Sequence, residues 1–538
     1  MISSLFRRPR IFKIFAAILL ISWYGFWLAT PVVFTTGDLG RHLKNGEIFL
    51  YSLGNAAQLT ALLHTNFYSS TFAAAPFINH HWATGVIFYI VWSLIGFRGL
   101  ALFYAALSLL TFLIFFRVAL FRAGWKITAP LAFFLIPLIA ERVEIRPEGF
   151  SYLFAALFFL LLTLHSQGRV RFRTLLIALP ILEMLWINFH IYFVFGLAII
   201  GFFGAGQFFT QPDKRVQIKK FGALFLLAAS AALLNPSGLN GFLFPLHIFQ
   251  NYGIGVSENQ PGWVLARQGF RLDNYPVFKI TLALLAGGIL ATLLKKRYNL
   301  MATAKAGLPL ASLGLAAVFG YLSWTAVRNY TFFGLFALPA LATLAHELLP
   351  DFSKYRATSR KMLAMAITAV VIGATLIINR TRISDHTKEY GIGILPNSLK
   401  AEKFFTDHNL QGPIFNDFDI GGYLIYTLFP RERPFVDNRP EAYPASAFQE
   451  IFLPMQVSPD MWQKQEEKFH FNAIIFSLDD RAPWTLPFIV ARLNDSTWAP
   501  VFADKSVIIF LKRNKLNEPV IKKFEIPNSS FGLRTVKE

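Results

Sequence analysis

Long apolar runs alternate with short polar segments over residues 1–379 of the chain. Each run predicts a membrane-spanning helix, because a helix needs about 20 apolar residues to cross a bilayer. The pattern predicts a bundle of about eleven transmembrane helices. They are expected at residues 12–33, 99–116, 127–140, 149–165, 174–188, 191–209, 221–235, 276–294, 307–326, 330–346 and 362–378.

The run at residues 83–97 does not fit this series. It is apolar enough to cross, but a crossing there would put Arg117 and Lys126 outside the cytoplasm. We therefore interpret 83–97 as a re-entrant or interfacial helix, with Trp82 and Trp92 at the level of the lipid headgroups. The alternative is a true span, with every later loop inverted.

After Asn379 the composition becomes that of a soluble domain. Strand-like runs alternate with helical ones, which predicts a small α/β domain over residues 380–515 and a tail over 516–538. The membrane domain is then 1–379, and its long outer insert is 35–82. Helices are expected near residues 398–408 and 421–428, and strands at 413–416, 434–438, 473–477, 499–503 and 507–511.

Composition supports a multi-pass α-helical membrane protein. Hydrophobic residues make up 54% of the 538 residues, charged residues 15%, and the mean hydropathy is +0.46. The net charge of +20 would indicate a nucleic-acid partner in a soluble protein. Here the cations lie in short clusters between apolar runs, so membrane topology and anionic lipid explain them and no nucleic-acid partner is expected. The absence of cysteine excludes disulfides, Fe–S clusters and thiol catalysis.

The distribution of Lys and Arg predicts the orientation. With the amino terminus in the cytoplasm, the cytoplasmic loops hold about 22 of these residues and the opposite loops about 8. The first apolar run lacks a good cleavage sequence and is interpreted as an uncleaved helix. This orientation puts 35–82, 141–148, 235–275, 328–329 and the carboxy-terminal domain outside the cytoplasm.

The predicted outer segments carry the candidate chemistry. Carboxylates can act as a general base or hold a divalent ion, and Arg and His can bind a phosphate leaving group. A basic and acidic hollow at the outer leaflet would suit transfer from a phosphate-linked lipid donor. The candidate residues are Asp38, Arg41, His42, His80, His81, Glu141, Arg142, Glu144, Arg146, His190, Glu258 and Arg328.

Each candidate also has a structural interpretation. Asp38 could cap the helix that follows it, and the turn from Glu141 to Glu148 could form local ion pairs of little energetic value. Arg328 could extend to the lipid headgroups. Two adjacent histidines, His80 and His81, hold a metal only when further ligands surround the ion.

Several motifs, taken in order, resemble one known family. The stretch GDLGRHLKNGE is followed by HTNFYSST and INHHWATGVIFY, and then by RPEGFSYLF, LWINFH, LLNPSGL and RNYTFFGLFALP. The carboxy-terminal part contains FNDFDIGGYLIYTLFPRERPFVDNRPEAY. Together they resemble bacterial GT-C membrane glycosyltransferases, in particular a group with a D-x-G-x-H-L-x-x-G-E motif after the first helix.

The resemblance implies a GT-C fold, a place in the bacterial inner membrane and a sugar-transfer activity. Members of the family move a sugar from a polyprenyl-phosphate donor to a lipid, glycan or protein acceptor outside the cytoplasm. Asp38 matches their catalytic acidic residue, and Glu141 and Glu144 lie where a second carboxylate is often found. The first loop lacks a D-x-D motif, and the H-E-W position reads His80-His81-Trp82. A metal requirement is therefore in doubt, no cofactor is certain, and a divalent cation stays open.

We expect an inverting displacement in which Asp38 takes the acceptor proton. Arg328, with Arg142 or Arg146, would hold the lipid phosphate. Two other functions stay open. A transporter or flippase of lipid-linked glycans needs polar residues deep within several spans, and the sequence offers Glu183 by position and no clear repeat. A non-catalytic scaffold of the cell envelope is the third, since a fold alone does not fix a function.

Overall fold

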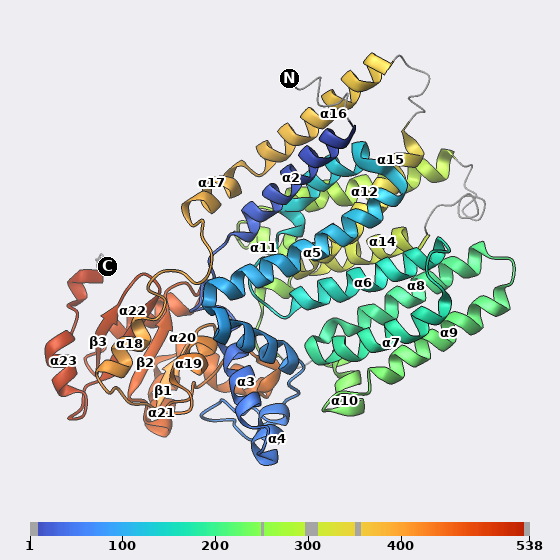
Figure 1. Ribbon diagram of the computed structural model, residues 1–538. Coiled ribbons are helices and arrows are strands. Elements are labelled where there is room, and N and C mark those ends of the chain that lie inside the picture. Colours follow the sequence, from blue (N-terminus) through green and yellow to red (C-terminus); the bar gives the residue numbers. More distant parts are fainter. Residues whose placement is uncertain (1–8, 249–251, 296–309, 350–356, 532–538) are drawn as a thin grey trace. The chain divides into compact units, whose positions relative to one another are not determined.

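A computed structural model describes residues 9–248, 252–295, 310–349 and 357–531 (Figure 1). The chain forms two compact units. The first, which we call the helical unit, comprises residues 1–30, 101–235 and 256–392. The second, the mixed unit, comprises residues 31–100, 236–255 and 393–538. The first outer insert and the carboxy-terminal segment thus belong to the same unit.

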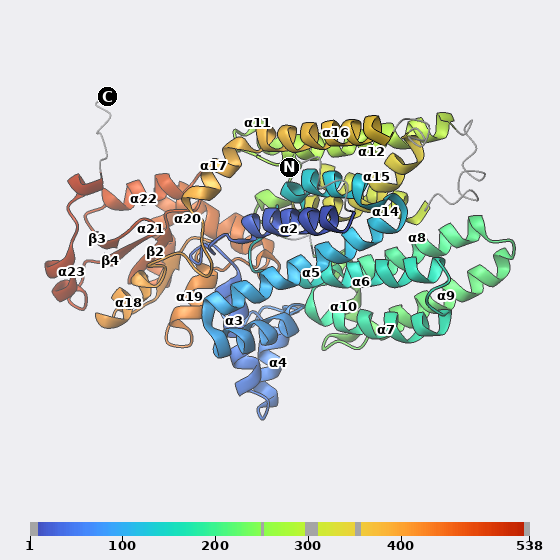
Figure 2. The same cartoon turned by 45° about the horizontal axis from the view of Figure 1, so that its top comes forward.

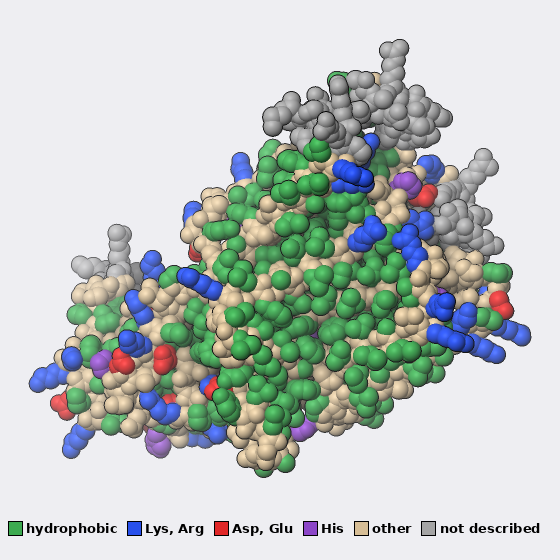
Figure 3. All heavy atoms as spheres, in the orientation of Figure 1, with side chains coloured by type: hydrophobic (Ala, Val, Ile, Leu, Met, Phe, Trp, Pro, Cys, Tyr) green, Lys and Arg blue, Asp and Glu red, His purple; other side chains and the backbone are tan. Residues whose placement is uncertain are grey.

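The helical unit is built from long apolar helices joined by short turns. It contains α2 (Pro9–Leu28), the second part of α5 (Trp82–Ile139), α6 (Glu148–Ser166), α7 (Phe172–Phe189), η1 (Ile191–Phe193), α8 (Val194–Thr210), α9 (Lys214–Ala231), η3 (Ser257–Asn259), α11 (Gly262–Arg267), α12 (Tyr275–Lys295), α14 (Leu310–Thr325), η4 (Val327–Asn329), α15 (Tyr330–Leu348), α16 (Ala357–Ile378) and α17 (Arg380–Lys388). Figure 3 shows hydrophobic side chains over most of the visible face of these helices, as expected for a surface in contact with lipid.

Each of the eleven predicted spans overlaps one of these helices, and residues 307–309 of the span predicted at 307–326 lie outside the described residues. In the described part of the chain, seven helices are long and apolar enough to cross a membrane, or eight if the bent pair α16–α17 is one span. Several predicted spans are shorter than this length test requires, and α5 contains two of them. A multi-pass membrane protein is therefore supported, while the count of about eleven stays a prediction.

Two glycines bend α5 at the predicted boundaries. Gly96 and Gly124 both have a φ of +66°, in the left-handed region that glycine adopts without steric cost. The first bend separates residues 83–97 from the next apolar run, and the second precedes the predicted span 127–140. Whether 83–97 crosses the bilayer or lies at its surface stays a prediction.

The mixed unit combines helices with one sheet. Its elements are α3 (Leu39–Tyr51), α4 (Ala56–His64), the first part of α5, α10 (Gly238–Leu243), η2 (Phe244–Leu246), α18 (Lys400–Asp407), β1 (Ile414–Asn416), α19 (Gly421–Leu428), η6 (Pro440–Ala442), η7 (Ala447–Phe452), α20 (Leu453–Val457), α21 (Pro459–Phe469), β2 (Ala473–Ser477), α22 (Thr485–Leu493), β3 (Trp498–Ala503), β4 (Val507–Lys512), α23 (Glu518–Phe524) and η8 (Asn528–Phe531). The strand order is β1-β2-β4-β3, with β1 parallel to β2 and the other pairs antiparallel. Trp462 of α21 and Phe488 of α22 belong to the aromatic core beside this sheet, and Figure 2 shows both helices along it.

Most predicted elements of the carboxy-terminal domain are confirmed. The helix at 421–428 and the strand at 473–477 have the predicted bounds, and the other strands match within a residue or two except one. The strand predicted at 434–438 is wrong. The backbone of that segment is hydrogen-bonded to the Asn416 side chain and not to a neighbouring strand. Phe435 N donates to Asn416 Oδ1 at 2.8 Å, and Asn416 Nδ2 donates to Val436 O at 2.8 Å.

The first outer insert packs on the carboxy-terminal segment through α3 and α19. A Cβ added at Gly40 of α3 would come within 2.6 Å of the carbonyl oxygen of Gly422 in α19. The two backbones therefore approach too closely for any larger residue at position 40. This contact holds the beginning of α3, where Asp38 lies, against the carboxy-terminal domain.

Candidate active site

Three arginines surround two carboxylates at one end of the helical unit. Arg142 Nη1 lies 2.6 Å from Glu258 Oε2, and Arg142 Nη2 lies 3.1 Å from Glu148 Oε1. Arg146 Nη1 lies 3.1 Å from Glu258 Oε2. Arg328 completes the set with longer ion pairs, 3.5 Å to Glu148 Oε1 and 3.8 Å to Glu258 Oε1. We call these five side chains the arginine–carboxylate cluster.

The turns between helices bring the cluster together. Arg142 and Arg146 lie between α5 and α6, Glu148 begins α6, Glu258 lies in η3, and Arg328 lies in η4 before α15. Because these turns contact one another, they lie at the same end of the unit. The sequence analysis predicted these segments to lie on the same side of the membrane.

His190 lies beside the cluster at the end of α7. Its Nδ1 shares a hydrogen bond of 2.8 Å with the hydroxyl of Ser151, which also accepts a bond of 2.8 Å from Trp186 Nε1. His190 is 2% exposed, so its ring is held in one orientation by α6 and α7. Ser151 and Trp186 were not foreseen from the sequence, because each lies inside an apolar run.

Burial and the neighbouring charges shift the pKa values of the cluster in opposite directions. Burial would raise the pKa of Glu258, but the charges of Arg142, Arg146 and Arg328 outweigh it and lower that pKa well below its ordinary value. Burial likewise opposes the charge of Arg142, while Glu258 and Glu148 raise its pKa well above the usual value. The cluster therefore sets three guanidinium groups against two carboxylates, of which Glu148 is buried and Glu258 is partly exposed.

The lowered pKa of Glu258 predicts that the stability contributed by the cluster falls in acid. A carboxyl whose pKa is lowered by folding stabilises the folded state above its unfolded pKa, near 4.5 for Glu258, and loses that contribution as the pH falls. Glu258→Gln is expected to lower the thermal unfolding midpoint of the detergent-solubilised chain at pH 7. The difference in unfolding midpoint between the variant and the natural chain should become smaller between about pH 5 and pH 3. A gap that is constant with pH would contradict the ion pairs.

Two predicted carboxylates, Glu141 and Glu144, are not among these five side chains, although Glu144 pairs with one of them. Glu141 accepts a hydrogen bond from Asn274 Nδ2, and Asn274 Nδ2 also donates to Pro137 O at 2.8 Å. Glu144 is 56% exposed and pairs with Arg146 Nε at 2.7 Å. The buried carboxylate of this turn is instead Glu148, which is 5% exposed. Its place in the first turn of an apolar helix was the available signal.

A second group of predicted residues meets in the mixed unit. Asp38 Oδ1 lies 3.4 Å from Arg41 Nη2, and Arg41 Nη2 lies 3.5 Å from His42 Nε2. The rings of His42 and His81 are 5.3 Å apart, and those of His80 and His81 are 3.8 Å apart. Arg41 and His42 are buried, whereas the Asp38 side chain is 21% exposed.

Asp38 occupies the N-cap position of α3. Its side chain makes no capping hydrogen bond, so the capping role considered from the sequence is not what orients its carboxylate. The carboxylate instead faces the guanidinium of Arg41.

A buried ion pair supports this group from the carboxy-terminal segment. Arg439 Nε and Nη2 each donate to the Asp437 carboxylate at 2.7 Å, and Nη2 also donates to Asn66 Oδ1 at 2.7 Å. The Arg439 guanidinium lies 5.3 Å from the Tyr68 ring centroid and 4.7 Å from that of Phe77. Burial would raise the pKa of Asp437, but Arg439 lowers it below its ordinary value.

This pair fixes the first outer insert to the FVDNRPEAY motif. Asn66, Tyr68 and Phe77 come from the insert, and the pair itself comes from the motif. The spacing of Asp437 and Arg439 in the sequence gives no sign of this long-range contact. Asp38 and Arg328 belong to different units, and their convergence stays a prediction.

The described residues do not fit a metal centre. No group of three or more His, Asp and Glu side chains in the described part of the chain could hold an ion. The pair His80 and His81 has no third ligand of this kind there. No step of the chemistry considered below passes through a metal.

Neither a protein-family model nor a curated protein matches the sequence. Solved structures do match. The archaeal oligosaccharyltransferase AglB from Archaeoglobus fulgidus, in complex with an inhibitory peptide and a dolichol-phosphate, aligns with a TM-score of 0.58 at 12% identity. The alignment covers 92% of this chain and 74% of AglB. An oligosaccharyltransferase from the same organism, in complex with Zn and sulfate, gives a TM-score of 0.56 at 13% identity. That alignment covers 92% of this chain and 73% of the oligosaccharyltransferase.

ArnT from Cupriavidus metallidurans, bound to undecaprenyl phosphate, aligns less well. Its TM-score is 0.49 at 12% identity, with 95% of this chain and 99% of ArnT covered. At such identities a structural match establishes the fold and not the activity. The chain therefore has a fold similar to that of the oligosaccharyltransferase AglB.

Proposed function

We propose that the protein is a glycosyltransferase that moves a sugar from a polyprenyl-phosphate donor to an acceptor outside the cytoplasm. The observation that carries the proposal is the arginine–carboxylate cluster, which collects three guanidinium groups at one end of a lipid-facing bundle. The fold supports it, since AglB was solved with a dolichol-phosphate. The acceptor is a lipid, a glycan or a protein.

The proposed reaction is an inverting displacement. Asp38 accepts the proton of the acceptor hydroxyl or amide while that atom bonds to the anomeric carbon of the sugar. The bond between the anomeric carbon and the phosphate oxygen breaks on the opposite side. The polyprenyl phosphate leaves with the electron pair of that bond, and arginine side chains balance its charge.

Arg328 is the arginine best placed to hold the leaving phosphate. Its ion pairs with Glu148 and Glu258 are long, at 3.5 and 3.8 Å, and its shortest bond is a neutral one, 2.7 Å to Asn259 Oδ1. Its Nε is buried and makes no hydrogen bond within the described residues, which is also true of Arg142 Nε. What sets Arg328 apart is that both of its ion pairs are longer than those of Arg142.

In a reconstituted assay, Arg328→Gln is expected to lower kcat/KM for the lipid donor by about 10- to 100-fold, the value of one charge-assisted hydrogen bond. The assay would use proteoliposomes, radiolabelled polyprenyl-phosphate sugars and an envelope extract as acceptor. Arg267→Gln is the control, because Arg267 is an exposed arginine of the same unit that packs on Trp263. Equal loss in both variants would remove Arg328 from this role.

One observation bears on the transporter alternative. Glu183 in α7 is fully buried, and neither carboxylate oxygen has a hydrogen-bond partner among the described residues. A transport path would need more such groups along the bundle. The charged side chains of the arginine–carboxylate cluster gather instead at one end of the helical unit, which favours the enzyme. In the same assay, movement of the label across the membrane without a chemical product would favour the transporter. If the assay shows no product and no movement of the label, the scaffold is favoured.

A further inference from the structure

The last long helix of the helical unit is poorly packed against its neighbours. Of the described side chains of α16, Thr375 alone is buried, and its hydroxyl donates to Val371 O in the same helix. Val370 and Ile377 are each 69% exposed. By contrast, α15 is buried from Tyr330 to Leu344. Helices in a membrane associate through close packing, and α16 itself makes little of it, although α17 after it is bonded to α5 through Arg382.

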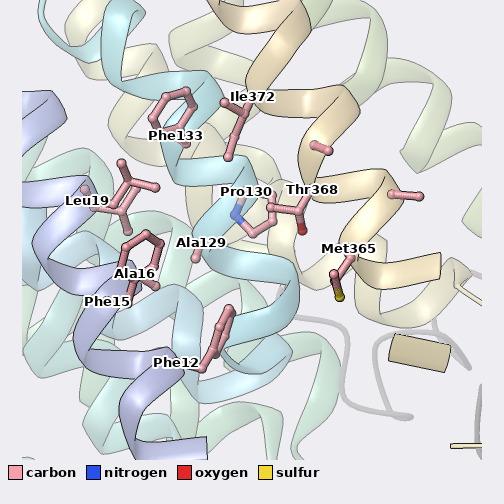
Figure 4. A pocket seen from close by; sticks show the side chains of 13 residues that line it. Phe12, Phe15, Ala16, Leu19, Ala129, Pro130, Phe133, Met365, Thr368 and Ile372 are labelled. Carbon is pink, nitrogen blue, oxygen red and sulfur yellow. The ribbon is translucent and has the colours of Figure 1, made fainter. Parts of the chain in front are cut away.

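An apolar groove separates α16 from the rest of the unit. It has a volume of about 520 Å³ and lies between α2, the last part of α5, and α16 (Figure 4). Phe12 and Phe15 line it from α2, Pro130 and Phe133 from α5, and Met365 and Ile372 from α16. Among the lining residues, Thr368 is the one with a polar side chain, and its hydroxyl donates to Ala364 O at 2.8 Å. An occupant of the groove therefore needs no hydrogen-bonding groups, and a hydrocarbon chain meets this condition.

Cations lie at one end of this groove. Along all three helices the lining residues advance in the same direction, from Phe12 and Met365 to Phe133 and Ile372. Arg10 and Lys13 precede or adjoin Phe12 on α2, and Lys126 lies one turn before Pro130 on α5; all three are exposed. No Asp or Glu occurs in residues 1–37 or 83–140, so no acidic residue of these two helices offsets the charge.

We propose that the groove binds one acyl chain of an anionic phospholipid, with its headgroup beside Arg10, Lys13 and Lys126. The acyl chain fills the space between α16 and the helices α2 and α5. Its contacts take the place of direct packing between these helices. The cations attract a negatively charged headgroup. With the orientation predicted above, this end faces the cytoplasm, where anionic lipids are found. The proposal does not depend on the proposed function.

The test is native mass spectrometry of the full chain in mild detergent, with palmitoyl-oleoyl phosphatidylglycerol or phosphatidylcholine added in turn. Phosphatidylglycerol should be retained more than phosphatidylcholine. Ala369→Trp fills the groove from an exposed position on α16 and should abolish retention. Ala374→Trp, also exposed on α16 and outside the groove lining, should not. In Lys13→Gln/Lys126→Gln, the preference for phosphatidylglycerol should fall by about 5-fold per cation removed.

Cross-linking locates the lipid in the natural chain and needs no variant to fold. Phosphatidylglycerol with a diazirine on its acyl chain should label peptides of α2, α16 and the last part of α5. Label spread evenly over all exposed helices would overturn the proposal, because it would show ordinary bilayer contact. Equal retention in both tryptophan variants would also overturn it, and so would displacement of phosphatidylglycerol by undecaprenyl phosphate, which would assign the groove to a polyprenyl chain.

Discussion

Replacing Asp38 with asparagine is expected to lower the rate of sugar transfer by about 10²- to 10⁴-fold, the usual contribution of a general base. Asparagine has the same shape but cannot accept the acceptor's proton. The fold should not change, since the partly exposed Asp38 side chain makes no capping hydrogen bond that asparagine would lose. The Asp38 side chain is 21% exposed and its carboxylate lies 3.4 Å from Arg41 Nη2, so a substrate can reach it.

The measurement is the initial rate in donor-loaded proteoliposomes, at saturating donor and acceptor. Asp213→Asn is the matched control, because Asp213 is also the N-cap of a helix and its side chain accepts a hydrogen bond from Val216 N. A loss confined to Asp38→Asn would support the base. Full transfer activity in Asp38→Asn would remove Asp38 from catalysis, whatever the control does.

Arg439→Met is expected to destabilise the mixed unit by about 3–5 kcal/mol, the cost of leaving one partner of a buried ion pair unpaired. The Asp437 carboxylate would stay in a site with no solvent exposure, and Asn66 Oδ1 would lose its donor. The two side chains are 2% and 0% exposed, so water cannot replace the guanidinium. Lysine would not substitute, because it lacks the planar fork that bonds both carboxylate oxygens.

Unfolding of the full chain, followed by intrinsic fluorescence in urea, measures this effect. Arg481→Met on the exposed surface should change stability by less than about 0.5 kcal/mol. The double variant Asp437→Asn/Arg439→Met should be more stable than Arg439→Met alone, since it removes the unpaired charge. If Arg439→Met unfolds like the natural chain, the pair does not hold the first insert to the carboxy-terminal segment.

The sequence predicted the elements better than it predicted their partners. Apolar residues recur along each helix because every turn places side chains in the protein interior or against lipid. The predicted bounds of the helix at 421–428 and of the strand at 473–477 agree with the structure. The strand expected at 434–438 was wrong because the side chain of Asn416 bonds that segment, and no local pattern shows this. A partner 19 residues away lies beyond any periodicity.

The candidate site was predicted in part for the same reason. The polar segments between the apolar runs could be recognised by their charge, so Arg142, Arg146, Glu258 and Arg328 were named as candidates. The structure brings these four side chains together, and their role in binding stays a prediction. Which carboxylate of the 141–148 turn would be buried depends on the packing of α6. The sequence favoured Glu141 and Glu144, and the structure buries Glu148. The bond from Arg439 to Asn66 joins positions 373 residues apart and could not be read from either motif.

The most direct test of the account is an experimental structure of the full chain in a lipid nanodisc with a polyprenyl-phosphate sugar bound. We expect the phosphate to contact Arg328 and the arginine–carboxylate cluster, with the Asp38 carboxylate on the opposite side of the anomeric carbon. A donor bound away from the cluster, or Asp38 facing lipid or bulk water, would contradict the proposed transfer reaction.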